Sequence, residues 1–257
     1  MDDLILFAGV GFLAQIVDGA LGMAYGVISS TVLLAFGVPP AMASASVHAA
    51  EVFTTAASAG SHALNRNVNW RLFAPLAVGG CIGGAVGAFV LTSVDGARIK
   101  PFITAYLAIM GAVILYRAWR GRTPSPFPVR WTGPLGLLGG FLDAVGGGGW
   151  GPTVTTAMVA SGEEPRISIG TVNTAEFFVT SAISAAFLAT LVSGHWTQSG
   201  VADHTRAVGG LILGGLLAAP LAGRVVRIIP VRALTWMVGA LVLLLSAWQT
   251  ARLLRLV

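Results

Sequence analysis

Long apolar runs that carry few charges are the feature that most restricts what this chain can fold into. Residues 72–91, 101–119 and 231–254 are three such runs. A helix needs about 20 predominantly apolar residues to cross the hydrocarbon core of a bilayer. Charged residues make up only 10% of the chain, whereas a soluble domain carries about 25%. The sequence therefore predicts an all-α integral membrane protein in contact with the lipid bilayer.

The remaining charges gather between the apolar runs. The formal net charge is +5, and arginines such as Arg117, Arg120 and Arg130 flank apolar segments, as the positive-inside rule describes. This distribution favours a multi-pass membrane protein over a nucleic-acid-binding protein. The acidic start of the chain, Asp2-Asp3, differs from the basic region of a signal peptide. We therefore expect the first apolar segment to be retained.

Motifs for catalysis, cofactors or metal ions are not visible in the sequence. The single Cys81 excludes an internal disulfide and a CxxC metal site. The phosphate-binding pattern GxxxxGK[ST] is missing, which excludes an ATPase within this chain. His48 and His62 lie fourteen residues apart, and no nucleophile motif accompanies them. We predict that the protein is not an enzyme and uses neither a cofactor nor a bound metal.

An internal repeat divides the chain into two related halves. A shift of 125 residues makes about fifteen of the forty-nine positions from 11 to 59 identical, without a gap. The informative coincidences are Asp18 with Asp143, Gly22 with Gly147, Gly26 with Gly151, Pro40 with Pro165, and Glu51 with Glu176. Chance matches in apolar sequence would not place acidic residues and prolines in one common register. Self-similarity at a fixed spacing indicates a fold built from repeated units.

Each half contains five apolar segments. They are roughly 4–17, 21–37, 41–62, 72–92 and 101–119 in the first half, and 133–145, 149–161, 167–191, 205–223 and 231–254 in the second. The first two segments of each half are short around a glycine-rich break, and they are either short crossings or re-entrant hairpins. We expect an N-terminal repeat over residues 1–120, a loop over 121–132 and a C-terminal repeat over 133–257.

Charge arithmetic favours opposite orientations for the two halves. If both short segments cross, or both re-enter from one side, the basic residues divide ten to five between the two faces of the membrane. Each half then has an odd number of crossings, so the halves form inverted-topology repeats, as in many secondary transporters. The same arrangement places both termini outside.

A polar stripe runs along the predicted third helix of each half. In the first half, spacings of three and four residues put six side chains on one helical face. They are Ser44, His48, Glu51, Thr55, Ser58 and His62. The second half keeps Asn173, Glu176 and Thr180. Ionisable groups inside a membrane are costly, so they need a partner or a function. The stripe either joins neighbouring helices by hydrogen bonds or lines a polar site.

The glycine-rich breaks are the second candidate feature. Residues 146–152 read Gly-Gly-Gly-Gly-Trp-Gly-Pro. Glycine allows the chain to unwind, and Pro152 suits the first turn of the next helix. Backbone N–H groups at a helix start can bind an anion in the middle of a membrane. Asp18 and Asp143, next to the two breaks, are expected to cap them.

We predict a central anion site formed by both breaks and both polar helices, operated by alternating access. The predicted substrate-binding residues are Gly22, Tyr25, Gly26, Ser46, His48, Gly147, Gly148, Gly149, Trp150, Gly151, Thr171 and Asn173. Glu51, Glu176, Asp18 and Asp143 are predicted to orient these donors or to carry protons.

The runs Asp18–Gly26, Ser44–Glu51 and Gly146–Pro152 resemble those of the TauE/SafE sulfite exporter family. The resemblance covers nearly the whole chain and implies movement of sulfite, sulfonates or related sulfur anions across a bacterial inner membrane. Where that family often has glycines in both halves, this chain has Leu21, Met23 and Tyr25. This departure could narrow the site or shift its substrate.

Two other classes of function compete with anion transport. Asp18, Glu51, Asp143 and Glu176 could together form a cation site in a proton-coupled transporter or exchanger. Hard cations require about six or more oxygens close together, whereas the breaks supply N–H donors, which favours an anion. The other class is a membrane enzyme or scaffold, which would not need two matched breaks. A homodimer is possible.

Overall fold

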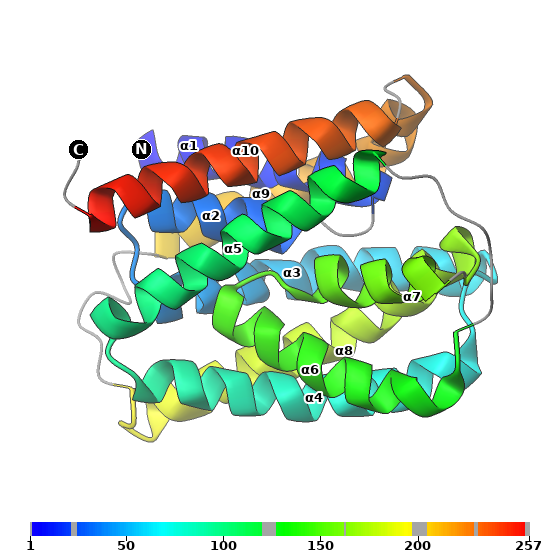
Figure 1. The fold of residues 1–257 in the computed structure, drawn as a ribbon, viewed down its shortest axis with the longest axis horizontal. Helices are drawn as coiled ribbons and strands as arrows, with labels where there is room; N and C mark the ends of the chain where they lie inside the picture. Colours follow the sequence, from blue (N-terminus) through cyan, green and yellow to red (C-terminus); the bar gives the residue numbers. More distant parts are fainter. Residues whose placement is uncertain are drawn as a thin grey trace.

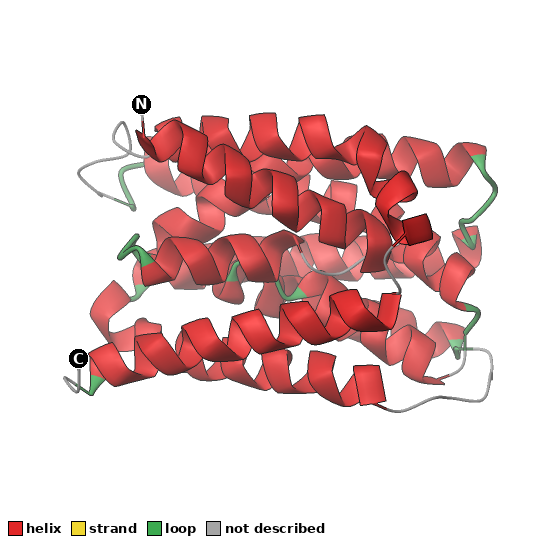
Figure 2. Cartoon of the chain, turned by 90° about the horizontal axis from the view of Figure 1, so that it is seen from above, coloured by secondary structure: helices red, strands yellow, loops and turns green. Residues whose placement is uncertain are grey.

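The structure is a computed structural model that describes residues 2–21, 25–119, 127–161, 163–196, 205–228 and 231–254. Gly22, in the first break, and residues 120–126 of the predicted inter-repeat loop lie outside these ranges. Over the described residues all regular secondary structure is helical, which confirms the all-α prediction (Figures 1 and 2). The helices of the first half are α1 (Asp2–Leu21), α2 (Tyr25–Ala35), α3 (Pro40–Leu64), α4 (Trp70–Ser93) and α5 (Gly96–Trp119). Those of the second half are η1 (Val129–Trp131), α6 (Thr132–Gly146), η2 (Gly151–Thr155), α7 (Thr156–Ser161), α8 (Pro165–Val192), α9 (Thr205–Ile228) and α10 (Val231–Leu253).

The outer surface of the bundle suits a lipid environment. Within the described residues, three helical stretches are long and apolar enough to cross a membrane, namely Trp70–Ser93, Gly96–Tyr116 and Ile167–Val192. Large apolar side chains point outward on many helices, for example Phe102 on α5 and Leu244 on α10. A soluble monomer rarely exposes apolar area on this scale. The surface is therefore that of a membrane protein.

Several of the described connections between long helices fall at two opposite ends of the bundle. At the first end, Pro39, Val94 and His195 border one cavity, which brings the α2–α3 and α4–α5 connections together with the residues after α8. At the second end, the Asn69 N–H before α4 donates to Thr171 Oγ1 near the start of α8, with an N···O distance of 2.9 Å. Figure 1 shows the first end on the left, together with both chain termini.

Two helical hairpins enter the bundle from these opposite ends. The hairpin of α1 and α2 begins and finishes at the first end, whereas α6 followed by η2 and α7 begins and finishes at the second end (Figure 1). The α6 helix packs along α4, and α1 packs along α9. Each hairpin therefore lies against a long helix of the other half of the chain.

These hairpin contacts are made through glycine. A Cβ atom added at Gly79, Gly83 or Gly140 would overlap the backbone of the facing helix in the α4–α6 pair. The same holds for Gly11 and Gly214 between α1 and α9. Small residues allow membrane helices to approach this closely. We call the α4–α6 contact the glycine seam.

The two polar helices, α3 and α8, pack against each other in the interior, while α5 packs against α10. Two predicted segments differ from the structure. The segment predicted over residues 4–17 extends from Asp2 to Leu21, because Ala20 and Leu21 are good helix formers, so Asp18 lies one turn before the end of α1. The segment predicted over 149–161 is divided into a π-helical turn, η2, and α7. Pro152 lies in the first turn of η2, where its missing N–H costs no intrahelical hydrogen bond.

Candidate functional site

The second break is an unwound stretch between α6 and η2, in the interior of the bundle (Figure 1). Gly147 has a φ of 69° and Gly148 a φ of 148°. Only glycine adopts such values readily. The N–H groups of both glycines donate to the carbonyl oxygen of Asp143, at 2.7 and 3.2 Å. The helix therefore ends in a tight turn, and the next N–H groups are free to point inward.

The carboxylate of Asp143 accepts those inward N–H groups. Its Oδ1 atom lies 2.7 Å from the nitrogen of Gly149 and 3.0 Å from the nitrogen of Trp150. The Asp143 residue is only 1% exposed. Two of the backbone donors predicted to bind substrate thus hold a carboxylate of the protein itself. The break can bind an anionic oxygen, and Asp143 supplies one.

The first break repeats this design. Asp18 Oδ1 accepts the N–H of Tyr25 at 3.2 Å, and Tyr25 stands seven residues after Asp18, as Trp150 does after Asp143. The aromatic side chains also correspond. The Tyr25 hydroxyl donates to the Leu211 carbonyl at 3.0 Å, and the Trp150 ring N–H donates to a carbonyl of α8 at 3.1 Å. Both rings are buried packing residues that brace the breaks.

His48 of α3 joins the first half to the second break. Its Nδ1 atom lies 2.7 Å from the Ser44 carbonyl, and its Nε2 atom lies 3.2 Å from Asp143 Oδ2. A carbonyl can only accept, so Nδ1 carries a hydrogen. When Nε2 is also protonated, His48 and Asp143 form a buried ion pair without net charge. The Ser44 hydroxyl donates to the Ala144 carbonyl at 2.5 Å, which fixes α3 against the end of α6.

The two breaks meet. A Cβ atom placed on Gly26 would lie 2.5 Å from the Cα atom of Gly148 and 2.9 Å from Glu51 Oε1. The Ser30 hydroxyl of α2 donates to the Gly147 carbonyl. The predicted convergence of Gly26 with Gly147 and Gly148 is therefore present in the structure. The backbones touch, and Gly26, Gly147 and Gly148 are buried.

Further carboxylates surround the meeting point. Glu51 is 3% exposed and Glu176 is 8% exposed. Asp18, Glu51 and Asp143 all lie within electrostatic range of Glu176. Glu51 Oε2 is buried and lacks a hydrogen-bond partner among the described residues. Over the same ranges, no three His, Cys, Asp or Glu side chains converge into a group that could hold a metal ion.

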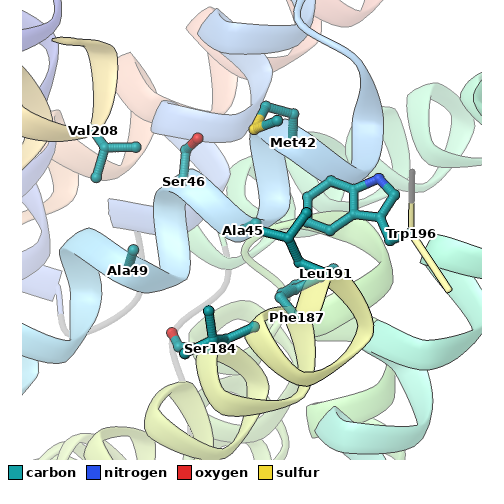
Figure 3. A pocket seen from close by; sticks show the side chains of 10 residues that line it. Met42, Ala45, Ser46, Ala49, Ser184, Phe187, Leu191, Trp196 and Val208 are labelled. Carbon is teal, nitrogen blue, oxygen red and sulfur yellow. The ribbon is translucent and has the colours of Figure 1, made fainter. Parts of the chain in front are cut away.

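The other predicted site residues lie further from the breaks or serve as packing. Gly151 begins η2. Thr171 accepts the Asn69 N–H at the second end of the bundle. Asn173 donates to the Ser58 hydroxyl at 3.2 Å, while its own Oδ1 is buried without a partner in the described part of the chain. Ser46 lines a separate cavity between α3 and α8 (Figure 3). Their roles in substrate binding stay predictions.

Two further residues at the second break carried only weak sequence signals. Ser30 is the middle of a Ser-Ser-Thr run in an otherwise apolar segment, and that run could have indicated a polar contact. Tyr106 reaches the break from α5, and a Cβ atom on Gly146 or Gly149 would overlap its ring or hydroxyl. A single tyrosine in an apolar helix gave no register or spacing from which to infer this position.

Comparisons with known proteins identify the family of the chain. The model of the family described as "Sulfite exporter TauE/SafE" matches residues 7–248. A probable membrane transporter protein of Bacillus subtilis strain 168, YtnM, is 40% identical over 258 aligned residues, which cover 96% of this chain and 82% of that protein. The chain therefore belongs to the TauE/SafE family and is a membrane transporter rather than an enzyme.

Proposed function

We propose that this protein is a secondary transporter that moves a small sulfur-containing anion across the membrane by alternating access. The observation that carries the proposal is the meeting of the two breaks around the buried His48–Asp143 pair. The description of the matching family as a sulfite exporter supports the substrate class. Sulfite and short sulfonates present oxygens to donors much as a carboxylate does.

The donors at the second break select for an anion. The N–H groups of Gly149 and Trp150 and the ring of His48 all converge on one carboxylate. Charge-assisted hydrogen bonds of this kind are the strong ones. The transported anion takes over these donors while Asp143 takes up a proton, and Asp143 releases the proton and takes the donors back when the anion leaves. The site is thus never left with unpaired buried donors, which would be costly.

Inverted repeats would provide the two access routes. One hairpin enters from the first end and the other from the second end, and each packs on a long helix of the opposite half. This matches the inverted arrangement of many secondary transporters, whose sites lie between the repeats. Movement of one hairpin away from the Gly26–Gly148 contact opens the site toward one end at a time.

Glu51 and Glu176 would carry protons that balance the charge of the anion. Both are buried, and Glu51 Oε2 has no hydrogen-bond partner within the described ranges. A buried ionised carboxylate without a partner is expensive. A proton removes that cost, so proton uptake and release at these side chains can accompany anion binding.

Purified protein in vesicles tests the proposal. Uptake of sulfite, thiosulfate and short sulfonates should exceed uptake of chloride, Na⁺ and Ca²⁺. The same sulfur anions should raise the Tm of the protein in detergent, because ligands that bind the native state stabilise it. Glu51→Gln and Glu176→Gln should impair net uptake while the folded protein is retained. Normal rates in both variants would remove these residues from the mechanism.

A proton-coupled cation transporter is the second candidate. It is favoured by the acceptor oxygens of Glu51 and Asn173 that lack partners among the described residues. A Tm shift with a cation alone, abolished by Glu51→Gln, would establish it in place of the anion transporter.

We further propose a location in the bacterial inner membrane, which membership of the family implies. The arginine distribution favours both chain termini outside. Labelling of single cysteines at the two ends of the bundle from either side of the membrane would test the orientation. A homodimer stays a prediction, which the mass of the purified particle would test.

A further inference from the structure

A second cavity lies between α3 and α8 (Figure 3). Its volume is about 260 Å³. Most of the wall is apolar, with Met42 and Ala45 from α3 facing Phe187 and Leu191 from α8. Small-molecule pockets begin at about 300 Å³, so this space approaches that size and exceeds what a bare oxyanion of a few atoms fills.

Two hydroxyl groups interrupt the apolar wall at its inner part. Ser46 and Ser184 both line the cavity. Ser184 Oγ is buried and has no hydrogen-bond partner among the described residues. A lipid acyl chain in the cavity would leave this hydroxyl unsatisfied, whereas an oxygen of an organic anion would accept its hydrogen. The unpaired hydroxyl therefore favours an occupant with both an apolar and a polar part.

The cavity adjoins the central site through one aromatic wall. The centroid of the Phe187 ring lies 6.4 Å from that of His48 and 5.8 Å from that of Trp196. Thr180, one turn before Ser184, donates to the His48 carbonyl at 3.2 Å. The inner end of the cavity is thus close to the His48–Asp143 pair, and its outer part, near Trp196, lies toward the first end of the bundle.

We propose that this cavity is a specificity pocket for an organic anion that bears a short unbranched apolar chain. The charged end lies toward Ser46, Ser184 and the central site, and the chain extends along Ala45 toward Leu191 and Trp196. The inference rests on the proposed anion transport and adds the class of substrate. The small side chain of Ala45 leaves the room that the chain occupies, so its size sets the longest chain carried.

Transport of alkanesulfonates by reconstituted protein tests this pocket. The panel is sulfite and the unbranched sulfonates from methanesulfonate to hexanesulfonate. The variants are Ala45→Leu, the milder Ala45→Val, and Ser184→Ala. Ala57→Leu is the matched control, because Ala57 is exposed on the same helix and does not line the cavity. The Tm of each variant in detergent reports folding.

We expect Ala45→Leu to lower hexanesulfonate uptake at least about tenfold relative to methanesulfonate, since filling a hydrophobic pocket discriminates by about 10- to 200-fold. Ala45→Val should move the longest sulfonate carried to an intermediate chain length. It serves as the test if Ala45→Leu fails to fold. Ser184→Ala should weaken binding of every sulfonate, and Ala57→Leu should match the wild type.

Three results would overturn the inference. The first is that Ala45→Leu lowers the uptake of all anions equally. The second is that uptake depends on the acyl chains of the bilayer and not on the chain of the sulfonate. The third is that the wild type carries sulfite but no sulfonate. In each case the proposed anion transport would stand. A wild-type protein that carries no sulfur anion at all would refute the proposed function itself.

Discussion

The two breaks share one frame and differ in charge. In both, an aspartate accepts the N–H of the residue seven positions later, and an aromatic ring braces the turn through a hydrogen bond to a carbonyl. At the second break, His48 neutralises Asp143 when its Nε2 atom is protonated. The residue that corresponds to His48 in the second half is Asn173, which is uncharged and donates to Ser58. Duplication has therefore kept the backbone design while the charge has diverged.

This difference suggests that the two breaks bind different species. The second break combines N–H donors with an imidazole, which suits an anion. Asp18 of the first break lies within electrostatic range of Glu51 and Glu176, and Asp143 of the second break is in range of both as well. Like charges so close in a buried site favour uptake of a proton. One break would hold the cargo and the other would hold protons.

The largest difference between the breaks should follow from removing each aspartate charge. Asp143→Asn leaves the buried His48 without its anionic partner, and breaking a buried ion pair costs about 3–5 kcal/mol. Asp18→Asn keeps an oxygen that can accept the Tyr25 N–H and should cost less than about 1 kcal/mol. Thermal unfolding in detergent measures both. Equal losses would show that the second break does not depend on its ion pair.

The next effect concerns His48. His48→Asn makes the two halves alike at this position and removes the cation next to the N–H donors. Hydrogen bonds to charged groups contribute about 1.5–3 kcal/mol, so the Kd for sulfite should rise about 10- to 100-fold. His62→Asn, on the same helix near its exposed end, is the control and should bind normally. Unchanged affinity in His48→Asn would place the anion elsewhere.

The contact between the breaks should tolerate no side chain. Gly148→Ala combines a positive φ with overlap against the Gly26 backbone, and overpacking costs about 1–3 kcal/mol. Gly60→Ala is the matched control, since nothing lies within 4 Å of a Cβ there and alanine stabilises a helix by about 0.5–1 kcal/mol. Denaturation of the two variants should therefore shift in opposite directions. A neutral Gly148→Ala would mean that the breaks do not touch.

The smallest effect should come from the aromatic braces. Tyr25→Phe removes one hydrogen bond to Leu211 and should cost about 0.5–1.5 kcal/mol. Trp150→Phe removes the corresponding bond and also leaves a void, because the Trp150 ring fills the space beside Gly80 and Gly139. It should cost more than Tyr25→Phe. The same loss in both would indicate that the second brace is packed loosely.

Much of this organisation could be predicted from the sequence because the repeat is strict in register. The common shift of Asp18 and Glu51 onto Asp143 and Glu176 located both breaks and both polar helices. Glycine and proline in residues 146–152 located the unwound stretch, since their backbone preferences are local. In the described residues, the unwound stretch lies between α6 and η2, and the polar stripes lie on α3 and α8.

Side-chain pairing was harder to predict because it depends on contacts across the bundle. The sequence indicated that Asp143 caps the break, but not that its other oxygen faces His48, ninety-five residues earlier. The 125-residue repeat put Ser46 and Thr171 in matching positions, whereas packing directs Ser46 to the separate cavity and Thr171 to the α3–α4 connection. Tyr106 had no counterpart in the other half that could reveal it.

The glycine seam has a consequence for how the chain could be divided. Since α6 of the second half closes directly on the backbone of α4 of the first, and α1 closes on α9, each half keeps a bare glycine face that only the other half covers. A fragment ending near residue 120 and a fragment beginning near residue 127 should therefore associate when made as two separate chains in the same cell. The protein would then work as a split pair, with the covalent link serving mainly to keep the two pieces in equal amounts.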